Sequence, residues 1–184
     1  MENDKVNEII DFEGEISEEE KDVPSKRHSL TQTNITVFLG NDERFATFVE
    51  LSLDSTSTDL SQFGIKNKDE VIPDISVYLE SPPFDDELGE DEVRVRKMPD
   101  LAIEVLSPTQ TINELLKKIK AYFALGIRSC WLVMPALEEV RVFSQQLQHY
   151  KNFDINNDET VVDELMDIQL PIQKIFRRRF AKTL

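Results

Sequence analysis

Two acidic residues lie in parts of the sequence that otherwise have the apolar pattern of β-strands. Asp74 stands in VIPDISVYLE, and Glu104 stands in DLAIEVLSP. A lone carboxylate is costly to bury, so each acid needs a compensating partner. The two acids are therefore the first candidates for a functional site.

The order of the two strands favours a site that contains both carboxylates. Consecutive strands are usually neighbours. Carboxylates roughly 4 Å apart repel by about 4 kcal/mol at an effective dielectric constant of 20. Either one of them takes up a proton, or a divalent cation that prefers oxygen ligands binds between them. A structural alternative stays open, in which Asp74 caps a turn after Pro73 and Glu104 meets a basic side chain.

A lysine-bearing helix follows the second acid. Lys118 and Lys120 flank opposite edges of its apolar stripe, whereas Lys117 points away from it. Periodicity therefore makes Lys117 the poorest partner for the acids, but it does not choose between Lys118 and Lys120. The alternative is that all three lysines simply solvate an exposed helix face.

The elements that position these residues follow from hydrophobic periodicity. A helix is expected from Ser25 to a stop at Gly40, and a second from the capping-box spacing of Thr111 and Glu114 to Gly126. Strands are expected in five places: 44–54, 71–80, 96–106, 129–134 and 140–144. The acidic segment 81–92 is expected to be a hairpin tip. A polar loop is expected to lead to a short strand and terminal helix within 167–176.

This order of elements predicts an α/β or α+β domain. A helix between the third and fourth strands indicates a crossover onto a mixed sheet that is covered on at least one face. Residues 1–24 are rich in acids and lack convincing periodicity, which predicts a disordered or loosely ordered tail. Residues 25–184 are then one folded domain.

Composition and charge narrow the class of protein. The 184 residues carry 36 acids and 21 bases, a net charge of −15, which at first argues against a nucleic-acid partner. Residues 1–22 hold ten acids and two lysines, and residues 85–92 hold six acids, so the remainder is close to neutral. The single cysteine, Cys130, excludes an internal disulfide and is expected to pack in the core. The absence of a long apolar run or an apolar leader predicts a cytoplasmic protein with no membrane partner.

Several motifs in this order resemble one known family. Residues 71–143, with PDISVYLE, then PDLAIEVLSPTQTINELLKKIKAYFALGIRSCWLVMP and VRVF, are similar to the Uma-type family of bacterial restriction-endonuclease-like proteins. That family belongs to the PD-(D/E)XK nuclease superfamily. The spacing of Lys118 and Tyr122, the stop at Gly126 and the Trp-Leu-Val run are part of the match. Residues 25–54 and the segment DIQLPIQKIF resemble the family more weakly.

The resemblance implies a restriction-endonuclease-like core and a metal-dependent endonuclease that hydrolyses DNA. It implies Mg²⁺ or Mn²⁺ held by Asp74, Glu104 and the backbone carbonyl of Val105. Lys118 is implied as the catalytic lysine, displaced from the strand to the following helix. A homodimer is implied because most superfamily relatives act as dimers.

Two positions depart from the expected pattern, one from that of the superfamily and one from that of the family. The lysine expected two residues after Glu104 is replaced by Leu106, and an aspartate that many members carry after the Trp-Leu-Val strand is replaced by Met134. The alternative function is therefore a catalytically weak or inactive interaction module with a nuclease fold. A metal-dependent hydrolase of smaller phosphate compounds is a third possibility.

Other residues are accessory candidates. Glu50 is expected either to face the metal site or to form an edge-strand ion pair. His28 is expected either to face phosphate or to lie at a solvated helix start, and Lys120 stays an alternative to Lys118. The basic run Arg177, Arg178 and Arg179 is a candidate for DNA contact, or for a solvated helix end or a partner of the acidic tail.

Overall fold

A computed structural model describes residues 24–66, 69–84, 92–145 and 149–178 of the chain. Its centre is a six-stranded sheet with the strand order β1-β4-β5-β6-β7-β8. The bounds of these strands are Ala46–Val49 (β1), Ile75–Tyr78 (β4), Leu101–Val105 (β5), Ser129–Met134 (β6), Glu139–Ser144 (β7) and Tyr150–Asp154 (β8). Only β5 and β6 run parallel in this sheet, and the other neighbours are antiparallel. The expectation of an α+β domain with a mixed central sheet is therefore confirmed.

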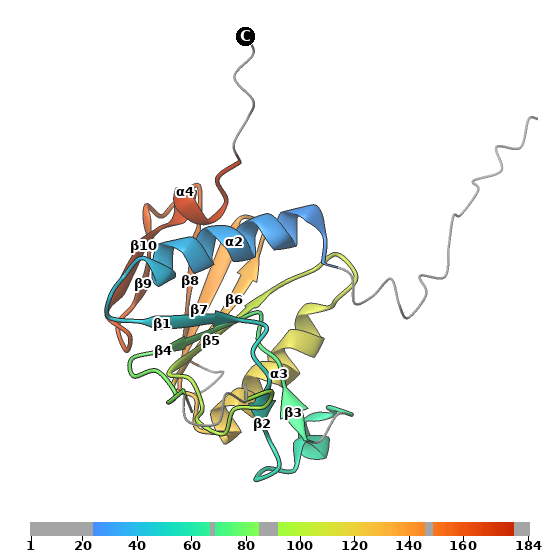
Figure 1. Ribbon diagram of the computed structural model, residues 1–184. Coiled ribbons are helices and arrows are strands. Elements are labelled where there is room, and N and C mark those ends of the chain that lie inside the picture. Colours follow the sequence, from blue (N-terminus) through green and yellow to red (C-terminus); the bar gives the residue numbers. More distant parts are fainter. Residues whose placement is uncertain (1–23, 67–68, 85–91, 146–148, 179–184) are drawn as a thin grey trace, which may run out of the picture.

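Helices cover both faces of the sheet. Helix α2 (Lys26–Gly40) lies across one face and helix α3 (Ile112–Ala124) lies on the other (Figure 1). Strand β5 divides its side chains between the two, because alternate residues of a strand point to opposite faces. Ile103 packs in the core beneath α2, and Ala102 packs in the core beneath α3.

Local sequence signals explain where both helices begin and where α3 stops. The Ser25 side chain accepts a hydrogen bond from the backbone of His28 and so caps α2. Thr111 and Glu114 form the expected capping box at the start of α3. Gly126 follows α3 with φ of 94°, a backbone conformation that favours glycine. Both predicted helices are confirmed.

The expected continuous strand over residues 44–54 is wrong. The chain leaves the central sheet at Glu50, whose φ is 51° and whose backbone N–H donates to the carbonyl of Asp74 at 3.2 Å. The segment Leu53–Asp54 (β2) instead pairs with Glu70–Val71 (β3) in a separate two-stranded sheet. A short 3₁₀ helix, η1 (Leu60–Phe63), lies between them in sequence, and this unit packs beside α3.

The expected polar loop between β7 and the last strand is also wrong. It contains β8 and the strand β9 (Thr160–Asp163), which pairs with β10 (Ile168–Pro171). Helix α4 (Ile172–Ile175) then packs against α2, so the expected terminal strand and helix are confirmed. Strand β8 escaped prediction because four of its five residues are polar or half-exposed, which obscures the apolar alternation of a strand.

Some expectations fall outside the described residues. These are the tail up to residue 23, the hairpin tip at residues 85–91, and Arg179. The described part contains no helix with the length and apolar character needed to cross a membrane. Cys130 is completely buried in the core on the α3 side, as expected.

Candidate active site

The structure places Asp74 and Glu104 at the same edge of the central sheet. Strands β4 and β5 are antiparallel neighbours in which Ile75 pairs with Ile103. Asp74 precedes Ile75 and Glu104 follows Ile103, so the two acids are the next opposed positions along the ladder. The prediction that the two strands are neighbours is therefore confirmed.

Asp74 is held by donors from three elements. Its Oδ2 atom accepts a hydrogen bond of 2.6 Å from the backbone N–H of Val105 and lies 3.3 Å from His28 Nε2. Its backbone carbonyl accepts a hydrogen bond of 2.9 Å from the Gln32 side chain and one of 3.2 Å from the N–H of Glu50. Asp74 thus links β5, α2 and the residue that follows β1. These contacts go beyond those of a residue that only caps a turn after Pro73.

Glu104 is buried and is held by α3. Its carboxylate is only 1% exposed, lies 2.7 Å from the Lys118 ammonium through Oε2, and accepts a hydrogen bond from the Tyr122 hydroxyl through Oε1. Burial raises the pKa of Glu104; Lys118 opposes this shift, and the negative charge of Asp74 adds to it. Because Asp74 and Glu104 are neighbours on the sheet, the negative charge of Asp74 makes ionisation of Glu104 less favourable.

Among the helix lysines, Lys118 is the one that contacts Glu104. Besides Glu104, its Nζ donates to the backbone carbonyl of Ile72 at 3.2 Å. Its side chain is 28% exposed. Lys120 is exposed on α3, and the Lys117 amine lies over Gly64. Of the two lysines that periodicity left open, Lys118 and not Lys120 is the one in contact with Glu104. The same contact agrees with the structural alternative, in which Glu104 pairs with a basic side chain.

Two residues of the site were not singled out as site residues from the sequence. Tyr122 was assigned to the apolar stripe of α3, yet its buried hydroxyl donates to Glu104, and burial raises its pKa well above the usual value so that it keeps this proton. Its spacing of four residues from Lys118 was the available signal, because residues four apart share a helix face. Gln32 stands at the same spacing from His28, which contacts the same acid.

The accessory candidates have different outcomes. His28 is only 5% exposed and lies against Asp74, so a solvated helix start is wrong. The Glu50 side chain is exposed, and its contact with the site is through its backbone. Arg178 forms an ion pair of 3.1 Å with Glu138, and Arg177 is exposed.

The two departures from the family pattern occupy apolar positions. Leu106 is half-buried among the residues packed beneath α3. Met134 is fully buried at the end of β6 in the same cluster. Neither side chain supplies a charge to the edge of the sheet, and the amine at the site comes from α3 instead.

The oxygen atoms at this edge fit a small divalent cation. The backbone N–H of Val105 donates to Asp74, and since the N–H and C=O of one strand residue point the same way, the Val105 carbonyl is expected on the same side. Two carboxylates and one carbonyl are hard ligands, and Mg²⁺ typically uses one or two protein carboxylates and keeps several waters. Within the described ranges, no group of three or more His, Cys, Asp or Glu side chains could hold a metal ion. Two carboxylates and one carbonyl would leave the remaining positions around a Mg²⁺ ion to water.

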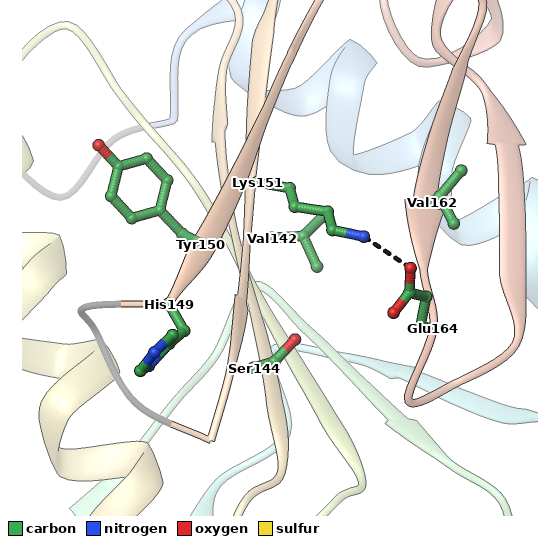
Figure 2. Close-up of a pocket in the computed structure, with 7 residues that line it drawn as sticks. All are labelled: Val142, Ser144, His149, Tyr150, Lys151, Val162 and Glu164. Carbon is green, nitrogen blue, oxygen red and sulfur yellow. Dashed lines mark hydrogen bonds and ion pairs between the residues drawn. The ribbon is translucent and has the colours of Figure 1, made fainter.

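A separate hollow of about 390 Å³ lies beside β7, β8 and the β9–β10 hairpin. Figure 2 shows Lys151 reaching Glu164, with Val142 and Val162 beside this ion pair. None of the predicted site residues lines it. The hollow has polar side chains of its own, Lys151 and Glu164 among them, but it is separate from the site at Asp74 and Glu104.

The fold and the site together define a class of protein. A mixed sheet between helices, with one acid just before β4, another on the adjacent strand β5 and a lysine on the following helix, is a nuclease-type fold. The chain belongs to the family Uma2, whose sequence model is described as "Putative restriction endonuclease" and matches residues 2–173.

A solved structure supports the same assignment. A protein from Anabaena variabilis, described as a putative nuclease belonging to DUF820, is similar to this chain with a TM-score of 0.65 and 25% sequence identity. The similarity covers 84% of this chain and 82% of the other. A search among curated proteins finds no match.

Proposed function

We propose that the chain is a cytoplasmic endonuclease that uses Mg²⁺ or Mn²⁺ to hydrolyse phosphodiester bonds of DNA. One observation carries the proposal. Asp74 directly precedes β4 and Glu104 lies on the neighbouring strand β5, one residue beyond the Ile75–Ile103 pair, and the Lys118 amine lies 2.7 Å from Glu104 with part of its side chain exposed. Membership of the family supports the reaction class.

Each residue has a separate task in this reaction. Asp74, Glu104 and the carbonyl of Val105 would hold the metal ion, which, when bound, activates water and neutralises charge on the scissile phosphate. Lys118 would orient the attacking water or accept its proton, and as an ammonium would stabilise charge on the phosphate oxygens. Tyr122 would hold Oε1 of Glu104 in place, while Oε2 lies 2.7 Å from the Lys118 ammonium.

At the basic end of the described part of the chain, Arg177 and Arg178 are both exposed, and Arg178 also forms an ion pair with Glu138. We propose that this basic end contacts the phosphate backbone, which positions a duplex without reading its sequence. A homodimer remains an expectation from the resemblance.

Nicking of supercoiled plasmid in the presence of Mg²⁺ or Mn²⁺ tests the proposal. Asp74→Ala and Glu104→Ala should abolish cleavage because each removes a metal ligand. Lys118→Met should reduce the rate by about 100-fold or more, the usual contribution of a proton-transfer group. Lys120→Met is the matched control, since Lys120 lies exposed on the same helix, and it should cleave at the unaltered rate.

Cleavage that survives Asp74→Ala and Glu104→Ala would overturn the proposal. If the unaltered chain binds Mn²⁺ but cleaves neither DNA nor a panel of nucleotides, the alternative of an inactive interaction module is favoured. Hydrolysis of nucleotides without cleavage of DNA would favour the hydrolase of small phosphate compounds.

A further inference from the structure

Helix α2 presents two polar side chains, one turn apart, to the same acid. His28 Nε2 lies 3.3 Å from the Oδ2 atom of Asp74, and the Gln32 amide donates to the Asp74 carbonyl at 2.9 Å. Residues four apart lie on one helix face, so both contacts come from the face that covers the sheet. One contact fixes the carboxylate and the other fixes the backbone to which it is attached.

Both side chains are buried, although both are polar. His28 is 5% exposed and Gln32 is 8% exposed. Further along α2, the inward positions are taken by Ile35 and Leu39, which are completely buried in the core. Buried polar groups cost stability unless they are hydrogen-bonded. Two buried polar side chains at the start of α2, where apolar residues would otherwise pack, are therefore explained by their contacts with Asp74.

The two ring nitrogens of His28 have different surroundings. Nε2 faces Asp74 Oδ2, and because a carboxylate oxygen only accepts hydrogen bonds, this contact is favourable when Nε2 carries a proton. The other ring nitrogen, Nδ1, is buried without a hydrogen-bond partner. The imidazole therefore directs its only engaged polar atom to Asp74.

The donors converge on one oxygen of Asp74. Oδ2 meets both His28 and the backbone N–H of Val105, which lies 2.6 Å away. Two contacts to Oδ2 restrict rotation of the carboxylate, and they leave the Oδ1 atom available to bind a cation. Asp74 lies just before β4, and its side chain is 20% exposed. Without these two donors, its carboxylate could rotate towards solvent.

We infer that His28 and Gln32 are positioning residues that set the orientation of Asp74 for binding a divalent cation. The inference rests on the proposed function insofar as Asp74 is a metal ligand. Partners that orient a metal ligand typically contribute 10-fold to 100-fold to metal affinity. Helix α2 would thus determine how tightly the ion binds, although it contributes no ligand of its own.

Calorimetric titration of the metal-free chain with Mn²⁺, without DNA, tests the inference. The amide nitrogen of glutamine can occupy the place of Nε2, whereas that of asparagine is too short to reach it. His28→Asn should therefore raise the Mn²⁺ dissociation constant by roughly tenfold or more, and His28→Gln should stay much closer to the unaltered value. Gln32→Glu keeps the size of the side chain but replaces its donor by an acceptor, and it should weaken binding in the same direction.

Two controls separate positioning from folding. His149→Asn changes the other histidine, which is exposed and lies outside this site, and should leave Mn²⁺ affinity unchanged. Thermal unfolding without metal identifies variants that fail to fold. If His28→Asn does not fold, His28→Gln and Gln32→Glu still decide the matter through their affinities.

The outcomes distinguish this inference from the proposed function. Mn²⁺ binding that is lost in Asp74→Ala but unchanged in folded His28→Asn and Gln32→Glu overturns the positioning role and leaves the proposed metal site intact. If His28→Asn and Gln32→Glu lose Mn²⁺ affinity as expected but the unaltered chain does not cleave DNA, the positioning role is supported and the nuclease reaction is overturned. A chain that binds no Mn²⁺ at all overturns both.

Discussion

Glu104 is the most constrained ionisable residue of the site. It is fully enclosed between β5 and α3, and its carboxylate meets one ammonium and one hydroxyl. Removing an ion from water is costly, and the attraction to one partly exposed lysine does not fully repay that cost. This is why its pKa lies above the ordinary value even though Lys118 is in direct contact.

The raised pKa of Glu104 predicts a pH-dependent stability. The folded chain holds this proton to a higher pH than the unfolded chain, in which glutamate titrates near 4.5. The contribution of Glu104 to the free energy of unfolding should therefore fall as the pH rises from that region through the raised pKa. Glu104→Gln cannot ionise, so its stability relative to the unaltered chain should increase from pH 4 to pH 8, as measured by urea denaturation without divalent metal.

Glu114 provides the control for this measurement. It is an exposed glutamate at the start of α3. Glu114→Gln should not reproduce the increase with pH that is expected at position 104. A difference between the Glu104→Gln and unaltered chains that stays constant over this pH range would contradict the argument.

At the scale of elements, the site depends on two helices that use the same spacing. Helix α2 contacts Asp74 through His28 and Gln32, and helix α3 contacts Glu104 through Lys118 and Tyr122. In both pairs the residues are four apart, which places them on the helix face turned to the sheet. The two acids are thus held from opposite faces of the same sheet.

The β9–β10 hairpin is attached to the central sheet by a buried acid. Asp163 is completely buried, and its Oδ2 atom accepts hydrogen bonds of 2.5 Å from the Ser129 hydroxyl and 2.8 Å from the Trp131 ring. Its Oδ1 atom accepts from the backbone of Leu165 and Met166. One side chain therefore shapes the hairpin turn and joins it to β6.

Removal of this side chain should destabilise the fold. Asp163→Ala leaves several buried donors without an acceptor, each of which costs about 1–3 kcal/mol. We expect a loss of roughly 3 kcal/mol or more in the free energy of unfolding, measured by urea denaturation. Glu164→Ala removes the neighbouring exposed acid and should have little effect. Equal losses in the two variants would contradict the role given to Asp163.

At the scale of the whole molecule, charge is unevenly distributed along the chain. Residues 1–22 and 85–92 hold sixteen of the 36 acids, so the rest of the chain is nearly neutral. Affinity for DNA depends on cations that release counterions from phosphates, and nearby acids oppose that release. The net charge of −15 therefore argues only against strong DNA binding by these two segments.

Deletion of residues 1–22 should strengthen binding to DNA at low salt. The deletion removes ten acids and two lysines. The gain should diminish as salt is raised, because screening weakens repulsion between exposed charges. Fluorescence anisotropy with a labelled duplex over a range of salt concentrations measures both effects. An unchanged affinity at low salt would mean that the acidic segment has no influence on DNA.

Local sequence patterns predicted most of the secondary structure near the site. The helices that became α2 and α3, and the strands that became β4, β5, β6 and β7, follow from apolar periodicity and capping residues, which act within a few positions along the chain. The same patterns identified Asp74 and Glu104, because an acid in an apolar strand stands out whatever the rest of the fold. Strand β8 and the break at Glu50 could not be found this way, since the first lacks a clear apolar alternation and the second depends on the carbonyl of Asp74.

By itself, the sequence determined which residue types were available for chemistry and which short elements carry them. Periodicity left open whether Lys118 or Lys120 contacts the acids, although the family resemblance implied Lys118, and the sequence did not identify Gln32 as a contact of Asp74 or His28 as buried. The tertiary structure decided these points because they depend on how α2 and α3 lie across the sheet. Contacts between residues separated by 14 to 46 positions, such as Lys118 with Glu104 and Lys118 with Ile72, arise only from that packing.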